Sequence, residues 1–190
     1  MMVYAHRGAS AYAPENTIPA FHLAVRLGAP AVENDIHLTA DGQIVVCHDD
    51  EISRTSNGKG CISQTTYAEL RRYDFGSDDF PRARIPSLAE FLEATQPMKL
   101  INIELKSPLP VGLHLVLLLD SLYDALSFCG RIGSTIVVTT GPDDESNGIQ
   151  LFAADCFMES FWTRRKPFGW LRNFMPTQSI LTSIISRKRQ

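Results

Sequence analysis

Residues 33–37 place two carboxylates and an imidazole at alternate positions of a predicted β-strand. The segment Ala31–Thr39 is rich in apolar and β-branched residues, yet Glu33, Asp35 and His37 recur at every second position. Alternate side chains of a strand share a face, so these three groups should point the same way. Two carboxylates on one buried face repel each other and lose hydration unless a cation lies between them. An edge strand with a solvated polar face is the alternative, and this segment alone favours neither.

Three further predicted strands also end in ionisable side chains. The strands and their groups are 2–5 with His6 and Arg7, 44–47 with His48, and 100–106 with Glu104 and Lys106. A surface turn with two incidental basic residues would explain the first group taken alone. Strands that alternate with helices form a parallel sheet or barrel, which gathers their carboxyl ends on one face. We therefore expect all four groups to meet there.

The combined groups suit metal-assisted phosphodiester hydrolysis. Three carboxylates form a hard oxygen-ligand set for Mg²⁺ or Ca²⁺. Two histidines could act as general acid and base, while Arg7 and Lys106 could hold an anionic substrate. The ion would polarise the phosphoryl oxygens while one histidine activates the nucleophile and the other protonates the leaving alkoxide. His37 shares the ligand face, but we expect it to be a packed or solvated residue.

The hydrophobic pattern predicts the elements that must position these groups. A helix capped by Asn16 or Thr17 precedes Gly28, and a turn at 40–42 separates the second and third strands. Residues 50–84 are an irregular excursion with a short helix at 66–73, and Ser87 caps the next helix. The remaining predicted elements are a helix at 111–128, a strand at 135–140, a polar loop at 141–148 and a helix at 149–162. A β-helix-β-turn-β beginning is typical of an α/β barrel.

Composition restricts the class of protein. Four widely spaced cysteines with no CxxC pair argue against a zinc knuckle and favour reduced thiols. We expect no signal peptide, and the longest apolar run, 111–119, is too short to cross a bilayer. A cytoplasmic protein is the expectation. All acidic residues precede residue 160, whereas 160–190 hold seven basic residues and no acid. Nucleic-acid binding suits the acidic body poorly.

Eight short motifs, in order along residues 3–107, resemble the glycerophosphodiester phosphodiesterase family. They are His6-Arg7-Gly8, Pro14-Glu15-Asn16-Thr17, Glu33-x-Asp35, Thr39-x-Asp41-Gly42, His48-Asp49, Arg54-Thr55, Ile85-Pro86-Ser87-Leu88 and Ile103-Glu104-Leu105-Lys106. The resemblance implies an α/β fold of the TIM-type (β/α) barrel kind with a small insertion at about 50–84. It also implies cleavage of a small-molecule glycerophosphodiester to glycerol 3-phosphate and an alcohol.

The resemblance also implies residue roles. They are an acid/base pair, His6 and His48; metal ligands for Mg²⁺ or Ca²⁺, Glu33, Asp35 and Glu104; phosphate-binding residues, Arg7 and Lys106; and supporting residues, Glu15 and Asn16. A role in starting the first helix is the structural alternative for the last two. The sequence identifies neither the metal nor the alcohol, and it leaves direct attack by water and a cyclic phosphate route both open.

The family pattern fades after Lys106. A full (β/α)₈ barrel takes about 250 residues, and the later family motifs are absent, so we expect a barrel that is incomplete at the C-terminus. The expected organisation is a partial catalytic barrel at 1–160 and a basic, aromatic tail at 161–190. A frameshifted or truncated gene product is the favoured explanation of the tail, ahead of a solvated basic segment or a surface for anionic lipid. The alternative to an enzyme is an inactive remnant that at most binds metal or phosphate.

Overall fold

The structure is a computed structural model that describes residues 3–106 with their side chains and the backbone of 135–140 and 151–154. The chain divides into two compact units, Met1–Asp155 and Cys156–Gln190, and all described residues belong to the first. The predicted helix at 111–128, the loop at 141–148 and the tail at 161–190 lie outside the described residues. The same holds for both tryptophans and for the tail's proposed lipid contact.

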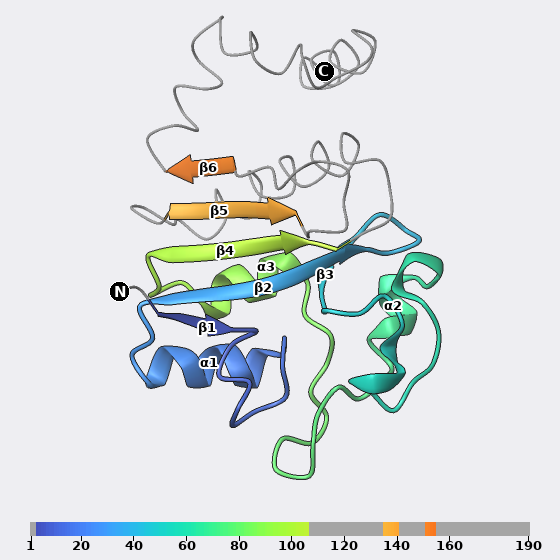
Figure 1. The fold of residues 1–190 in the computed structure, drawn as a ribbon. Helices are drawn as coiled ribbons and strands as arrows, with labels where there is room; N and C mark the ends of the chain where they lie inside the picture. Colours follow the sequence, from blue (N-terminus) through green and yellow to red (C-terminus); the bar gives the residue numbers. More distant parts are fainter. Residues whose placement is uncertain (1–2, 107–134, 141–150, 155–190) are drawn as a thin grey trace, which may run out of the picture. The chain divides into compact units, whose positions relative to one another are not determined.

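Four strands form the parallel part of one sheet (Figure 1). They are β1 (Tyr4–His6), β2 (Ala31–Leu38), β4 (Leu100–Leu105) and β5 (Thr135–Thr140). They lie in the order β1-β2-β4-β5, so β2 is flanked on both sides by parallel neighbours. This arrangement brings the carboxyl ends of β1, β2 and β4 to one edge of the sheet, as expected.

The third strand runs the opposite way. β3 (Ile44–Val46) pairs antiparallel with the end of β2, and Cys47 donates its backbone N–H to the carbonyl of Asp35 at 3.0 Å. The expectation that His48 ends a strand parallel to the others is therefore wrong. A turn at 39–43 is too short for the crossover that parallel neighbours require. The hairpin instead brings the chain back to the level of Asp35, where His48 follows Cys47.

The predicted helix at 149–162 is also wrong over the part that the structure describes. Leu151–Ala154 form strand β6, which pairs antiparallel with β5. A short apolar run such as Leu-Phe-Ala-Ala suits a buried strand and a buried helix equally, because it carries no periodicity that separates them. The pairing with β5 decides the outcome.

Two helices bury one face of the sheet. Helix α1 (Ile18–Arg26) and helix α3 (Leu88–Ala94) contribute Phe21 and Phe91, whose rings meet edge to face with centroids 4.7 Å apart. They pack on side chains that alternate along β2 and β4, namely Val32, Ile36, Ile101 and Ile103. Asn34 lies on this helix-facing side of β2 and is fully buried. The other face of β2 is left for the polar residues.

Residues 50–84, the segment predicted to be an insertion and called the insertion below, lie beyond the carboxyl ends of the strands (Figure 1). The insertion contains the 3₁₀ helices η1 (Ile52–Arg54) and η2 (Ile62–Gln64) and the short helix α2 (Tyr67–Leu70), which was predicted. A second apolar cluster joins the insertion to β3; its members are Val45, Cys47, Ile52, Ile62, Leu70, Phe75 and Ile85. None of the described helices has the length and apolar character needed to cross a lipid bilayer.

Candidate active site

Three carboxylates from two neighbouring strands converge on the polar face of the sheet. Glu33 and Asp35 lie on β2 and Glu104 lies on β4, where the parallel register pairs Asp35 with Glu104. One oxygen from each carboxylate lies within 4.8 Å of the others. The structure thus brings together the three residues that are predicted from the sequence to be metal ligands.

Burial dominates the electrostatics of Glu33, which is only 7% exposed. Desolvation, reinforced by the charge of Asp35, raises the pKa of Glu33 to about 7. Its Oε2 atom accepts the backbone N–H of Arg7 at 3.1 Å. Its Oε1 atom is buried and has no hydrogen-bond partner within the described part of the chain. A buried carboxylate oxygen without a donor is the kind of group that a bound cation satisfies.

Asp35 is fully buried but is surrounded by donors. The Nδ2 atom of Asn16 donates to Oδ2 at 2.9 Å, and Nε of Arg7 lies 3.2 Å from the same oxygen. Nζ of Lys106 lies 3.5 Å from Oδ1. These contacts stabilise a buried negative charge that solvent cannot reach.

Asn16 owes this contact to its backbone. It has φ +55°, a left-handed conformation that asparagine tolerates better than most residues. The helix-capping position falls on the next residue, Thr17, whose hydroxyl donates to the carbonyl of Pro14 at 2.6 Å instead of capping α1. Asn16 therefore serves the carboxylate site rather than the start of the helix.

Lys106 lies between two of the carboxylates. Its Nζ atom is 2.8 Å from Oε1 of Glu104, in addition to its approach to Asp35. Partial burial lowers the pKa of Lys106, but the carboxylates of Glu104 and Asp35 outweigh it and raise the pKa overall. The ammonium group thus stays charged at the rim of the cluster.

The last residue of β1, His6, and the next residue, Arg7, lie beside the cluster. Nε2 of His6 lies 3.8 Å from Oε2 of Glu33, and the imidazole is largely exposed. Arg7 has φ +57°, and Gly8, with φ +80°, packs directly against Ala20 of α1. A Cβ atom at Gly8 would lie 2.8 Å from the carbonyl carbon of Ala20. The glycine therefore allows the turn to lie flat on the helix.

The imidazole of His48 is oriented by its neighbour in sequence. Its Nδ1 atom lies 2.6 Å from Oδ1 of Asp49. The guanidinium of Arg54, with a smaller contribution from His48, lowers the pKa of Asp49 to about 2, so Asp49 is a carboxylate at neutral pH. A carboxylate only accepts hydrogen bonds, so Nδ1 of His48 carries the proton. Its Nε2 atom is then the nitrogen that can accept a proton in a reaction.

His37 supports His48 from behind. It is 4% exposed, and its Nε2 atom donates to the backbone carbonyl of His48 at 3.0 Å. Burial lowers the pKa of His37 and favours the neutral ring. Of the two expectations for this residue, the packed one is confirmed.

Sequence reasoning assigned no role to Asp49 or Arg54. Arg54 contacts both Asp49 and Glu15 through its guanidinium group. Glu15 also accepts Nη1 of Arg7 at 3.1 Å, which places this predicted supporting residue beside the site. The presence of Arg54-Thr55 among the motifs was the available signal, but no contact could be inferred from it.

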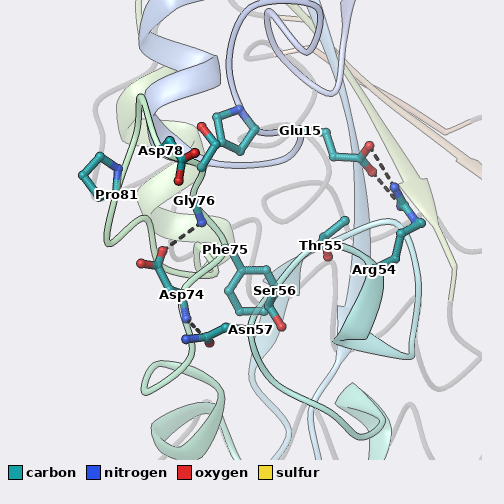
Figure 2. Close-up of a pocket in the computed structure, with 12 residues that line it drawn as sticks. Glu15, Arg54, Thr55, Ser56, Asn57, Asp74, Phe75, Gly76, Asp78 and Pro81 are labelled. Atoms are coloured by element: carbon teal, nitrogen blue, oxygen red, sulfur yellow. Dashed lines mark hydrogen bonds and ion pairs between the residues drawn. The ribbon is translucent and has the colours of Figure 1, made fainter.

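A pocket of about 740 Å³ adjoins this network (Figure 2). The Glu15–Arg54 pair forms one side of it, and Asp74, Gly76 and Asp78 of the insertion form the other. Phe75 supplies an aromatic surface between them. The volume of the pocket falls in the range of about 300–1,000 Å³ that small-molecule sites occupy.

Sequence comparison identifies relatives of this chain. A family model described as the glycerophosphoryl diester phosphodiesterase family matches residues 6–139. The YhdW protein of Bacillus subtilis (strain 168) is 48% identical over 118 residues, which cover 60% of this chain and 49% of that protein. A glycerophosphodiester phosphodiesterase of Caldanaerobacter subterraneus subsp. tengcongensis is 44% identical over 110 residues, covering 56% of this chain and 45% of that protein. The chain spans about half the length of these curated relatives.

Solved structures give the same result. An Oleispira antarctica phosphodiesterase, in complex with the product sn-glycerol-3-phosphate, aligns with a TM-score of 0.66 at 36% identity, over 74% of this chain and 57% of that one. A glycerophosphodiester phosphodiesterase from Agrobacterium tumefaciens aligns with a TM-score of 0.63 at 28% identity, over 77% and 60%. The expected α/β fold of the TIM-type barrel kind is confirmed, and the parallel strands β1, β2, β4 and β5 correspond to part of such a barrel.

Proposed function

Because the chain belongs to the glycerophosphoryl diester phosphodiesterase family, we propose that it hydrolyses glycerophosphodiesters to glycerol 3-phosphate and an alcohol. The observation that carries this proposal is the meeting of Glu33, Asp35 and Glu104 within 4.8 Å beside His6. The product bound to the Oleispira antarctica relative supports the choice of substrate class.

The carboxylate cluster fits a divalent cation. The donors are hard oxygens, and Oε1 of Glu33 and Oδ1 of Asp35 are buried without a hydrogen-bond partner within the described residues. We propose Glu33, Asp35 and Glu104 as the ligands of Mg²⁺ or Ca²⁺, both of which prefer such oxygens. The ion would supply Lewis-acid polarisation of a phosphoryl oxygen.

The chain's own residues supply substrate binding and proton transfer in this proposal. The guanidinium of Arg7 and the ammonium of Lys106 lie beside the carboxylate cluster, where they would bind a phosphodiester anion. Nε2 of His48 and the exposed imidazole of His6 form the acid/base pair. One imidazole takes a proton from the nucleophile, which is water or a hydroxyl group of the substrate, and the other gives a proton to the leaving alkoxide.

The experiment that tests the activity incubates the purified chain with glycerophosphocholine and either Mg²⁺ or Ca²⁺. We expect release of glycerol 3-phosphate that depends on the cation and falls by about 10²- to 10⁴-fold in His6→Ala and in His48→Ala. If the wild-type chain releases no more glycerol 3-phosphate than a variant carrying both His6→Ala and His48→Ala, the proposal fails and the inactive remnant is favoured. Because the chain spans about half of its relatives, this direct assay is required for the chain itself.

The nature of the nucleophile is tested in ¹⁸O-labelled water. Early sampling for a cyclic phosphate distinguishes attack by a substrate hydroxyl from attack by water.

We propose a cytoplasmic location, supported by Cys47 and Cys61, which are both free thiols.

A further inference from the structure

Arg54 ends helix η1 at the junction of the barrel and the insertion. All three of its guanidinium nitrogens contact carboxylates of this chain. Nε contacts Oδ2 of Asp49, Nη1 donates to Oε2 of Glu15 at 3.1 Å, and Nη2 donates to Oε1 of Glu15 at 2.8 Å. Because all three nitrogens already contact carboxylates, this guanidinium is a poor site for substrate phosphate. Its bidentate geometry instead orients the carboxylates that it contacts.

Asp49 is held from two sides. One oxygen contacts Arg54, and the other lies 2.6 Å from Nδ1 of His48. A carboxylate fixed on one oxygen cannot rotate freely, so the direction of its other oxygen is fixed as well. Arg54 thereby controls the hydrogen bond that selects the tautomer of His48.

Glu15 extends the contacts toward the carboxylate cluster. Its Oε1 atom is shared by Arg54 and by Nη1 of Arg7, and Nε of Arg7 lies 3.2 Å from Asp35. Negative and positive groups thus alternate without a break from Asp49 to the buried Asp35. Contact with Arg54 is the first cause that lowers the pKa of Glu15, in keeping with a bidentate pair.

Stability alone does not account for this arrangement. The Arg54 side chain is about half exposed, and ion pairs in such positions contribute about 0–1 kcal/mol because solvent screens them. Their bidentate geometry, in contrast, restricts orientation whatever their net energy. The function of the contacts is therefore geometric.

We propose that Arg54 is a positioning residue that holds Asp49, and through it the imidazole of His48, with the proton on Nδ1 and Nε2 turned to the substrate. Glu15, which Arg54 also contacts, pairs with Arg7, but Asp35 holds the Arg7 guanidinium independently of Arg54. The inference rests on the proposed acid/base function of His48. It extends that function by a residue that touches neither the carboxylate cluster nor, in this proposal, the substrate.

The test compares Arg54→Gln and Arg54→Lys with the control Arg71→Gln in the full chain. Arg71 is also a partly exposed arginine of the insertion. Its ion pair is with Glu90, at 3.1 Å, and does not involve His48. The first readout is a long-range ¹H–¹⁵N spectrum at alkaline pH, where imidazoles are neutral. The signal of His48 is assigned by its loss in His48→Ala. The second readout separates kcat from KM for glycerophosphocholine.

We expect a single Nδ1–H tautomer of His48 in the wild type and in Arg71→Gln, and a mixture of tautomers in Arg54→Gln. We also expect Arg54→Gln to lower kcat by about 10- to 100-fold, the cost of a misplaced catalytic group, with KM within about twofold. Arg54→Lys should be intermediate, because one ammonium cannot contact both carboxylates as a guanidinium does.

An unchanged tautomer in Arg54→Gln would overturn the inference. A rise in KM at constant kcat would also overturn it and indicate direct contact with the substrate. An equal loss of kcat in Arg71→Gln would attribute the effect to the insertion as a whole. If the wild-type chain is inactive, the proposed function fails, while the spectrum still decides the function of Arg54.

Discussion

Nε of Arg7 lies 3.2 Å from Oδ2 of Asp35, a carboxylate that solvent does not reach. Glu33 lies two residues away on the same face of β2, yet burial raises its pKa, and among the described residues its side-chain ion pair is with the exposed imidazole of His6. The two carboxylates therefore differ: Asp35 is stabilised by the chain's own cations, whereas Glu33 depends on an added one. The predictions below use this difference.

Replacing Asp35 with Asn should abolish cation binding. The substitution removes a proposed ligand and leaves the nearby charges of Arg7 and Lys106 without their buried partner, so repulsion of a divalent cation increases. We expect the affinity to fall by more than the ~10–100-fold that loss of an outer partner of a metal site costs. Calorimetric titration with Mg²⁺ and Ca²⁺ measures it. Glu93→Gln, on the exposed side of α3, serves as the control, and affinity equal to wild type in Asp35→Asn would contradict the assignment.

Glu33 should make the metal-free chain less stable as the pH rises. Its pKa is about 7 in the folded chain, against 4.5 when exposed, so between these values the folded state binds the extra proton. The contribution of Glu33 to stability is therefore fully present below pH 4.5 and is lost as the pH rises through about 7. The loss is on the order of 3 kcal/mol. Urea titrations in EDTA from pH 5 to 8.5 measure this dependence, which Glu33→Gln should flatten.

A bound cation provides the check on that pH dependence. Saturating Mg²⁺ or Ca²⁺ should restore stability most strongly above pH 7, where Glu33 is charged. An equal pH dependence in wild type and in Glu33→Gln would show that another group is responsible.

Lys106→Met should tighten cation binding and impair the reaction. Nζ of Lys106 lies 2.8 Å from Glu104 and 3.5 Å from Asp35, so its charge opposes a cation held by the same carboxylates. Removing one unit charge a few ångströms away should lower the dissociation constant by on the order of tenfold. KM for glycerophosphocholine should rise, because a phosphate contact is lost. Weaker cation binding together with an unchanged KM would contradict both parts.

Gly8→Ala should destabilise the chain more than Gly42→Ala. The two glycines have nearly equal backbone angles, φ +80° and +78°, but a Cβ atom has no room at Gly8 and meets nothing within 4 Å at Gly42. Gly42→Ala should cost about 1 kcal/mol for the left-handed conformation alone. Gly8→Ala should cost about 1–3 kcal/mol more because of the contact with Ala20. Urea denaturation of the two variants measures the difference, and equal losses would show that α1 can move aside.

The residues on β2 and β4 were predictable because strand alternation places Glu33 and Asp35 on one face and a parallel register adds Glu104. The direction of β3 was open to prediction, since a turn at 39–43 permits only a hairpin, but the charged pattern at its end suggested another parallel strand. β6 was not predictable, because four apolar residues have no distinguishing period. The contacts of Arg54 were also beyond prediction, since they join residues 15, 49 and 54 only after the insertion has folded.

The insertion is attached to the barrel at two separated points. Oε2 of Glu90, in the first turn of α3, accepts the hydroxyl of Tyr67 at 3.0 Å and Nη1 of Arg71 at 3.1 Å, while Arg54 clasps Glu15 on the other side. To swing about a single hinge, the insertion would have to break the contacts at one of these points. We therefore expect substrates to be selected by whether they fit against this wall of the pocket, and not by a closing motion of the insertion.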